Sequence, residues 1–284
     1  MSNPRFIKKR VKSIKNINKI TKALEMVAAS KVQRAQDKAM LGKPYSQKVL
    51  ELVQSLAGEK DVDMNQVPLM RVSVSPQKRL FVLISTNRGL AGSLNTNLFR
   101  EVIRTVKETP RTNLFITVGK KGRSLALTHG ELIGDFSDYN PREAASAAIA
   151  SEIIDTFTRE VVDEVYLVYS DFVSALNQKP TIKKILPLII EQSESIERPL
   201  YSFEPSPTEV LSQLLPFYIE VILAEAIFEA EASEHSARMI AMKNASDNAK
   251  SLGESLSLEY NNARQQAITT EINDIVTAGL SLDS

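Results

Sequence analysis

Residues 17–36, INKITKALEMVAASKVQRAQ, decide the fold class because they show that the chain begins as a long, basic, amphipathic helix. Apolar residues recur every three or four positions, which is the spacing of one face of an α-helix. Lysine, arginine and other polar residues occupy most positions between them. Such a helix can bind nucleic acid, lie on a membrane, or pair with another helix while its charges face a partner protein. The rest of the sequence has to distinguish these three possibilities.

The helical pattern extends on both sides of this stretch. Gly42 is the only proline or glycine between Pro4 and Pro44, so little interrupts a helix that we expect to run to about residue 56. At 1.5 Å per residue such a helix would be roughly 80 Å long. Its predicted apolar stripe consists of Ile7, Val11, Ile14, Ile17, Ile20, Leu24 and Val27.

The C-terminal segment predicts a second, longer helix. After Pro216 there is no proline, and the only glycines are Gly253 and Gly279, so we expect a helix over about 207–280, roughly 110 Å long. Helices of this length need a packing partner, and the two terminal segments therefore predict an antiparallel coiled coil. The predicted stripe is rich in small residues that allow close approach: Ile222, Ala226, Ala230, Ala237, Ala241, Ala245, Ala249, Leu252, Leu256, Tyr260, Ala263 and Ala267.

The charges of the two ends agree with this pairing. Residues 1–34 contain ten lysines and arginines against Glu25 alone, a net charge of +9. From Thr208 to the end, four basic residues oppose twelve acidic ones, a net charge of −8. Exposed ion pairs contribute little stability each, so the opposite charges bear mainly on orientation and register.

The middle of the chain has a different pattern. Short runs of β-branched and aromatic residues alternate with amphipathic helical stretches, which predicts a small, Rossmann-like parallel sheet. The fold class is therefore α/β, with a long antiparallel coiled coil added. We expect three domains, at 1–60, 76–200 and 207–284. The expected strands are 79–85, 113–119 and 164–170, with 180–188 as a further edge strand, and the expected helices lie near 93–108, 120–128 and 142–161.

Composition excludes several kinds of chemistry. The chain has no cysteine and only two histidines, so disulfides, thiolate nucleophiles and cysteine-bound zinc are excluded. The turn STNRGLAGSLN, residues 85–95, follows a strand but lacks the spacing of a nucleotide-binding GxGxxG motif or a P-loop. We therefore expect no catalytic residue, no cofactor and no metal. We also expect no secretory signal, and the printed sequence contains no uncharged apolar run of about 20 residues that would span a membrane.

Two alternatives to a rod-forming interaction protein remain open at this point. One is a coiled-coil scaffold associated with nucleic acid, which the basic N-terminal helix would suit. That helix has no aromatic residue in 1–44 except Phe6, and it keeps an apolar stripe that needs a partner. The other is a doubly wound enzyme with helical arms, which would bind a nucleotide near Gly89 and Gly92.

Three stretches closely resemble the gamma subunits of F-type ATP synthases. They are KITKALEMVAASK at 19–31, ASEHSARMIAMKNASDNA at 232–249 and YNNARQQAITTEINDIV at 260–276. A fourth stretch, NRGLAGSLN at 87–95, also looks like the central turn of that family. The resemblance spans nearly the whole chain, and the presence of both terminal motifs in this order is specific.

The resemblance implies a non-catalytic rotor. In that family the paired terminal helices form an axle inside a ring of three alpha and three beta subunits, the alpha3beta3 hexamer, and the α/β domain contacts the epsilon subunit and the c ring in the membrane. The implied function is to couple ion flow through the c ring to conformational cycling of the catalytic beta subunits. We expect no bound nucleic acid, and a peripheral location at the cytoplasmic face of a bacterial cell membrane, with membrane association only through the c-ring part of the complex.

The resemblance also implies which residues meet these partners. Tyr201 and Glu204 are expected near the epsilon subunit and the c ring. The basic N-terminal helix would face acidic loops at the mouth of the catalytic ring. The residues expected to contact that ring are Lys22, Leu24, Glu25 and Met26 in the first helix and Arg238, Arg264, Gln265 and Thr269 in the last.

Overall fold

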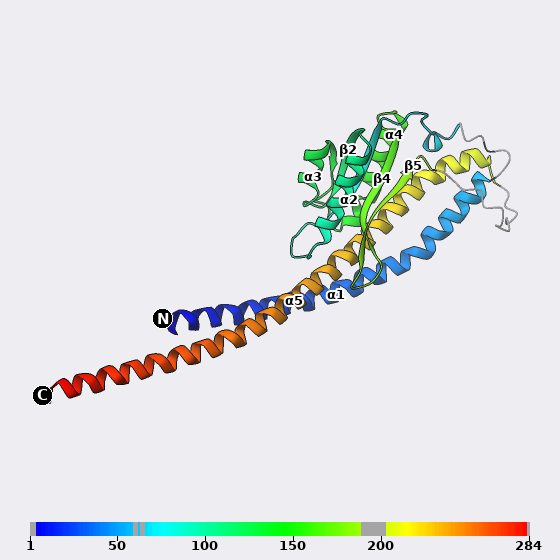
Figure 1. Cartoon of the computed structure of the whole chain (residues 1–284). Helices are drawn as coiled ribbons and strands as arrows, with labels where there is room; N and C mark the ends of the chain where they lie inside the picture. Colours follow the sequence, from blue (N-terminus) through cyan, green and yellow to red (C-terminus); the bar gives the residue numbers. More distant parts are fainter. Residues whose placement is uncertain (1–3, 59–61, 63–65, 189–202, 283–284) are drawn as a thin grey trace. The chain divides into compact units, whose positions relative to one another are not determined.

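The computed structural model describes residues 4–58, 62, 66–188 and 203–282, with side chains omitted at 39–41, 43 and 277–282. Along the chain, one long helix precedes and another follows a five-stranded sheet that has its own shorter helices (Figure 1). The helices are α1 (Pro4–Ala57), α2 (Leu94–Glu108), α3 (Arg123–His129), α4 (Ser146–Thr158) and α5 (Pro207–Leu282), with short 3-10 helices η2 (Pro68–Met70) and η3 (Arg142–Ala145). The strands are β1 (Lys78–Ile84), β2 (Thr112–Val118), β3 (Glu131–Asp135), β4 (Glu164–Phe172) and β5 (Gln178–Leu186).

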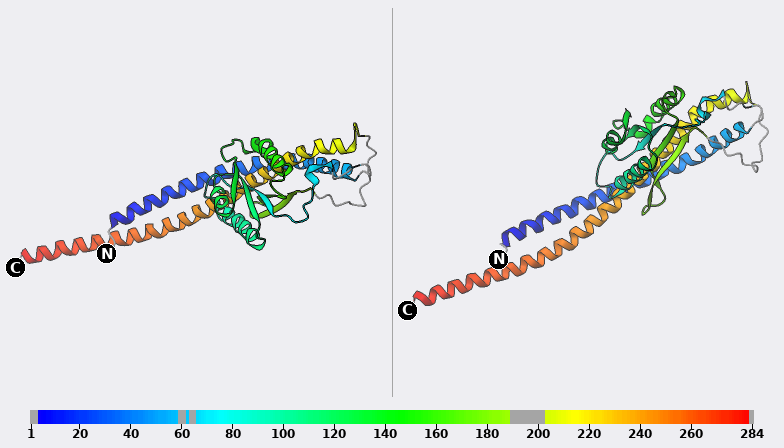
Figure 2. Two further views of the ribbon diagram at one scale, coloured as in Figure 1. Left: turned by 90° about the horizontal axis from the view of Figure 1, so that it is seen from above. Right: turned by 45° about the horizontal axis from the view of Figure 1, so that its top comes forward.

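The two predicted terminal helices are confirmed as α1 and α5. The chain divides into two compact units, one made of Met1–Ala28 with Arg238–Ser284 and the other of Ala29–Ala237. In the first unit the two helices are antiparallel, since Asn18 contacts Ser246 while the earlier Ile14 lies beside the later Gly253. Figure 2 shows these segments side by side in both views. The predicted boundaries of three separate domains stay a prediction.

The second unit contains the sheet, whose strand order is β3-β2-β1-β4-β5. Strands β1 to β4 run parallel, as predicted, and β5 runs antiparallel to β4 at one edge. The predicted edge strand at 180–188 is thus confirmed as β5, whereas the other edge strand, β3, was not predicted. The helix predicted over 142–161 is also more complex, because it begins as η3 and becomes α-helical only from Ser146.

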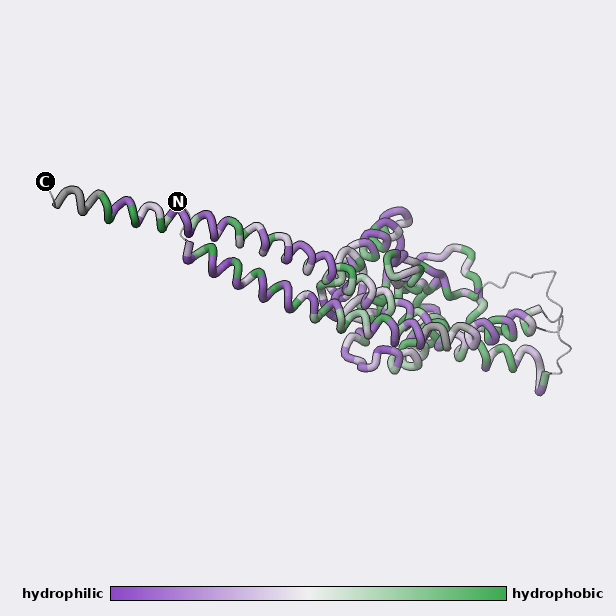
Figure 3. Tube along the Cα trace, turned by 90° about the horizontal axis from the view of Figure 1, so that it is seen from below, coloured by the Kyte–Doolittle hydropathy of each residue, from purple (hydrophilic) through white to green (hydrophobic). Residues whose placement is uncertain are grey.

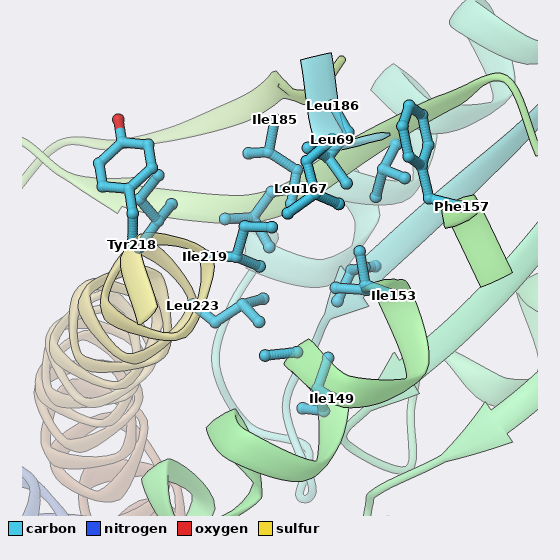
Figure 4. Close-up of a cluster of buried hydrophobic side chains, with 14 of the residues drawn as sticks. Leu69, Ile149, Ile153, Phe157, Leu167, Ile185, Leu186, Tyr218, Ile219 and Leu223 are labelled. Atoms are coloured by element: carbon cyan, nitrogen blue, oxygen red, sulfur yellow. The ribbon is translucent and has the colours of Figure 1, made fainter. Parts of the chain in front are cut away.

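Helices cover both faces of the sheet, which explains why its strands are almost continuously apolar. Helices α2 and α3 pack on the face that carries Phe81 and Phe115. The opposite face packs against α4, α5 and the end of α1. Figure 4 shows this second core, where Ile219 and Leu223 of α5 lie near Ile153 of α4 and strand residues. The apolar part of α5 therefore lies in the core of the second unit.

Candidate partner-binding surfaces

The seam between the two helices of the first unit is made of small and polar residues. On α5 the buried positions Ser246, Ala249 and Gly253 recur every three or four residues. A Cβ atom added at Gly253 would lie 3.5 Å from Cγ2 of Ile14, so the backbone of α5 approaches α1 closely there. The side-chain amide of Asn18 donates to the carbonyl oxygen of Ser246 at 2.7 Å. Close approach through small residues is as predicted, but two residues of the predicted stripe are wrong: Leu252 is exposed, with Gly253 buried beside it, and Ala267 is exposed.

The predicted stripe on α1 is correct only in its first part. Ile7 is buried and Val11 and Ile14 are half-buried, but after Ile14 the face toward α5 continues one residue later than predicted. One residue corresponds to about 100° around a helix, so a shift of one position moves a side chain off the seam. The seam residues are the half-buried Asn18, Thr21 and Glu25 and the buried Ala28, whereas the predicted Ile17, Ile20, Leu24 and Val27 are exposed.

These four apolar residues form an exposed strip along one side of α1, which we call the outer α1 face: Ile17, Ile20, Leu24 and Val27. Their exposed fractions range from 36% for Leu24 to 59% for Ile20. The neighbouring Met26 is 61% exposed. An apolar strip at i, i+3, i+4 spacing on the surface of a helix is typical of a face that docks against a partner. The outer α1 face is thus a candidate docking surface that sequence reasoning had assigned to the seam.

The residues predicted around this face have different environments. Leu24 and Met26 are exposed, so both are available to a partner. Glu25 points toward the seam, and its side chain is only 16% exposed. The ammonium Nζ of Lys22 lies 3.0 Å from Oε1 of Glu25, and the Lys22 side chain is 56% exposed. Because i,i+3 pairs along one helix contribute only about 0.2–0.5 kcal/mol and the Lys22 side chain is mostly exposed, Lys22 can turn from Glu25 to an acidic partner at little cost.

The C-terminal part of α5 offers a second surface. Every described side chain from Arg264 to Val276 is exposed, including the predicted Gln265 and Thr269. The Thr269 hydroxyl donates to the carbonyl oxygen of Gln265 at 2.9 Å, one turn earlier. Ile268, Ile272 and Ile275 form an exposed apolar stripe along the same stretch. In Figure 3, hydrophobic and hydrophilic segments alternate along this end of α5.

Three predicted positions lie outside these two surfaces: Arg238, Glu204 and Tyr201. Arg238 is half-buried rather than fully exposed, so its side chain is only partly accessible to a partner. Glu204 is exposed, and Tyr201 lies outside the described residues. The roles given to all ten predicted residues stay predictions.

The glycine-rich turns at the carboxyl ends of β1 and β2 hold each other in place. The Ser85 hydroxyl donates to the carbonyl oxygen of Gly119 at 2.9 Å and accepts the N–H of Gly122 at 2.8 Å. The N–H of Lys120 donates to the side-chain oxygen of Asn87 at 3.0 Å, and the N–H of Thr86 faces the Asn95 side-chain oxygen at 3.3 Å. These N–H groups already have protein acceptors, whereas a phosphate cradle needs them directed at a ligand.

The first of these turns also holds a strained residue. Leu90 has a φ of 64°, in the left-handed region that residues with a side chain rarely adopt. The residue is also 65% exposed. An exposed apolar residue on a strained backbone is a candidate contact residue. The sequence shows no signal for it beyond the neighbouring Gly89.

Among the described residues, one helix meets the length and hydropathy of a membrane span: the α5 segment Pro207–Val276. Its apolar residues Leu215, Ile219, Leu223 and Ile227 are buried in the core between α5 and the sheet. Within the same described residues, no cluster of histidine, aspartate and glutamate is arranged to hold a metal ion.

Comparison with known proteins gives a consistent result over the whole chain. The sequence model of a family described as ATP synthase matches residues 3–282. The chain is 41% identical over 289 residues to the ATP synthase gamma chain of a Roseiflexus species, with 99% of both sequences covered. It is also 41% identical over 295 residues to the ATP synthase gamma chain of Herpetosiphon aurantiacus, with both sequences covered in full.

Solved structures show the same fold. A chain from the Euglena gracilis mitochondrial ATP synthase, in a structure that includes the c ring, has a TM-score of 0.67 at 20% identity, with 98% of this chain and 94% of that chain covered. A chain from the central stalk and c ring of the Tetrahymena thermophila mitochondrial ATP synthase has a TM-score of 0.60 at 25% identity. That match covers 80% of this chain and 99% of the Tetrahymena chain.

Proposed function

Because this chain belongs to the family of ATP synthase gamma chains, we propose that it is the central-stalk rotor of an F-type ATP synthase. It would couple ion flow through the membrane c ring to conformational cycling of the catalytic beta subunits. ATP synthesis is the forward direction, and ATP hydrolysis would turn the same rotor in reverse.

The outer α1 face is the observation that carries the proposal beyond family membership. A helix pair that served only as a spacer would bury its apolar residues in the seam and expose polar ones. Here the seam contains Asn18, Thr21 and Glu25, while Ile17 and Ile20 are exposed. This distribution fits a helix pair that is itself surrounded by other subunits.

Coupling follows from the asymmetry of the helix pair. One side of α1 presents the exposed apolar strip, and other sides present lysines such as Lys12 and Lys19. A ring of three equivalent catalytic subunits would therefore meet different surfaces of the rotor at the same moment. Since a partner shifts a conformational equilibrium only through differential contacts, each catalytic site would be biased toward a different nucleotide affinity.

The predicted contact residues have specific roles in this proposal. Lys22 would bind an acidic loop of the ring, and Leu24 and Met26 would provide apolar contact beside it. On α5, Arg264, Gln265 and Thr269 would meet the ring with polar groups, supported by the stripe that contains Ile268. Arg238 would act from its half-buried position. Tyr201 and Glu204 would lie near the epsilon subunit and the c ring.

The chain would contribute no catalytic group of its own. The turns near Gly89 and Gly122 use backbone N–H groups for internal hydrogen bonds, which favours a structural role. ATP chemistry would take place in the beta subunits, and no cofactor is assigned to this chain. The rotor would lie at the cytoplasmic face of a bacterial membrane, attached peripherally through the c ring.

Co-assembly tests this proposal. The chain is expressed with the alpha, beta, epsilon and c subunits of its own complex, purified through a tag on the beta subunit, and reconstituted into vesicles. We expect one copy to copurify and ATP-driven proton pumping to depend on it, whereas the isolated chain shows no ATP turnover. A ring that assembles and pumps equally well without the chain, or ATP turnover by the pure chain, would contradict the proposal.

A further inference from the structure

An ionic joint in the second unit, buried at Arg142 and Glu234 but half exposed at Lys38, connects the sheet domain to both long helices. Its centre is Arg142, the first residue of η3, whose side chain is only 11% exposed. The guanidinium Nη2 lies 2.7 Å from Oε2 of Glu234, and Nε lies 3.9 Å from Oε1 of Glu231. Both carboxylates belong to α5, so one arginine holds η3 to two successive turns of that helix.

The same arginine also contacts the sheet. Its Nη1 donates to the carbonyl oxygen of Ser85 at 3.4 Å, directly after the end of β1. A single planar guanidinium thus bridges the carboxyl end of the central strand and the acidic side of α5. Arginine suits such a position because its donors form a fixed fork that is sensitive to direction.

The next residue, Glu143, makes the matching contact with α1. Its Oε1 lies 2.6 Å from Nζ of Lys38, and the same ammonium stands 5.6 Å from the ring centre of Phe228 on α5. The neighbouring residues Arg142 and Glu143 therefore carry opposite charges toward two different helices. Turning the sheet domain about α5 would break both contacts together.

The charges at the joint depend on one another. Burial raises the pKa of Glu231 above its usual value, Glu143 and Glu234 add to the rise, and the charges of Arg142 and Lys38 oppose it. The hydrogen bond to Glu143 is the main cause of the raised pKa of Lys38. Without Arg142, two glutamates of α5 would remain buried close together without their shared cation.

The apolar core and the ionic joint have different mechanical properties. Apolar contacts between α5 and the sheet are strong but non-directional, so they resist separation more than sliding or turning. Buried ion pairs fix register, and this role is better attested for them than a gain in net stability. The joint also lies at the last turns of α5 within the second unit, which ends at Ala237.

We propose that Arg142 is a positioning residue that fixes the angle of the sheet domain on α5, with Glu143 and Lys38 doing the same for α1, so that torque passes between domain and helices without slippage. The torque part of this inference rests on the proposed rotor function. The angular part concerns the isolated chain and stands independently of it.

The angular part is tested by distance measurements between spin labels. The chain contains no cysteine, so the exposed Leu127 of α3 and Gln213 of α5 can each be replaced by a labelled cysteine. We expect Arg142→Met to broaden the distance distribution and Arg142→Lys to broaden it less. The matched control is Arg159→Met, which removes an exposed arginine that directly follows α4 and pairs with Asp155 of that helix at 2.8 Å. Equal widths in Arg142→Met and the control would overturn the inference.

The torque part is tested in the assembled complex, by protons pumped per ATP hydrolysed in vesicles. We expect Arg142→Met to lower this ratio by roughly twofold or more relative to Arg159→Met at equal assembly, because turns that slip hydrolyse ATP without moving the c ring. Arg142→Lys should restore part of the loss, which a general stability defect would not explain. A normal ratio in Arg142→Met together with a broadened distance distribution would overturn the torque role alone.

Two further outcomes are also decisive. If Arg142→Met does not fold, Glu234→Gln replaces it in both assays, since it removes the α5 carboxylate that lies 2.7 Å from the Arg142 guanidinium, and unchanged results there would overturn the inference. If the parent chain neither assembles nor supports pumping, the proposed rotor function fails, while the label distances still decide whether Arg142 fixes the angle.

Discussion

Replacing Gly253 with alanine should stabilise the helix pair of the first unit. Gly253 lies in the interior of α5, where glycine is about 0.8–1.0 kcal/mol less favourable than alanine. The new methyl group would stand 3.5 Å from Cγ2 of Ile14, which is ordinary van der Waals contact. The gain in helix propensity is therefore not offset by a clash, and we expect about 1 kcal/mol of added stability.

Gly119→Ala is the matched substitution with the opposite expected sign. Gly119 has a φ of +110°, and an added Cβ would lie 2.1 Å from the carbonyl oxygen of Ser85. Both the backbone conformation and the contact oppose a side chain at this position. The loss of folding stability should therefore be larger than the roughly 0.4–1 kcal/mol by which a compatible Gly→Ala substitution stabilises a protein. The same change of residue thus stabilises at one position and destabilises at the other.

Urea unfolding followed by circular dichroism at the helical band measures both variants. With about 1–3 kcal/mol per molar of urea, a gain of about 1 kcal/mol moves the midpoint up by roughly 0.3–1 M. Gly119→Ala should move it down. A lowered midpoint for Gly253→Ala at unchanged slope would show that Gly253 and Ile14 lie too close together for an added methyl group. This result would refute the reasoning.

Three other changes have defined outcomes. Ala249→Leu should destabilise the chain by about 1–3 kcal/mol because it overpacks a seam position that is only 7% exposed, and an unchanged urea midpoint would place this residue outside the seam. Met26→Lys should reduce ATP synthesis more than subunit assembly and recover partly at high salt, because added charge near acidic loops is screened over about 10 Å at 0.1 M; equal loss of assembly would argue against a coupling role. Glu164 should contribute stability that disappears in acid: burial alone would raise its pKa, but hydrogen bonds from Lys184 and Tyr166 and the charge of Arg111 hold the pKa below its usual value. Its contribution is present above the unfolded pKa and is lost as pH falls through the folded one, so Glu164→Gln should flatten the fall in stability below about pH 4.5.

The large features of the fold could be predicted because they follow from patterns of residues that are close together in the sequence. Long intervals without proline or glycine predicted α1 and α5, and runs such as RLFVLIS predicted the buried parallel strands. Strand β3 was missed because its five residues, ELIGD, are too few and too mixed to show a period. It pairs at the sheet edge with β2, where the neighbouring strand supplies the hydrogen bonds.

The surface of α1 could not be predicted from periodicity alone. Two series fit the spacing after Ile14, one through Ile17 and Ile20 and one through Asn18 and Thr21. Hydropathy predicts that the first series lies in the seam, but in the structure the second series lies there and the first is exposed. The Asn18 side chain has its partner 228 positions away on α5, and no local pattern identifies such a pairing.

The ionic joint was missed for a similar reason. Arg142 and Glu143 lie in a 3-10 helix between two elements, where no helical period assigns a buried side. The carboxylate that faces Arg142 at 2.7 Å is 92 positions away in the sequence. By contrast, the residues assigned to the catalytic ring came from the resemblance to gamma subunits, and their contacts stay predictions.

Rotation itself is the most direct test of the central claim. A single cysteine at position 127 places a fluorescent or bead label on the sheet domain of a chain that has no other cysteine, and the catalytic ring is fixed to a surface through its beta subunits. On addition of ATP, we predict that the label turns continuously in one direction, in steps that reflect the three catalytic subunits. If the ring hydrolyses ATP while a bound, labelled chain remains stationary, the chain is not the rotor.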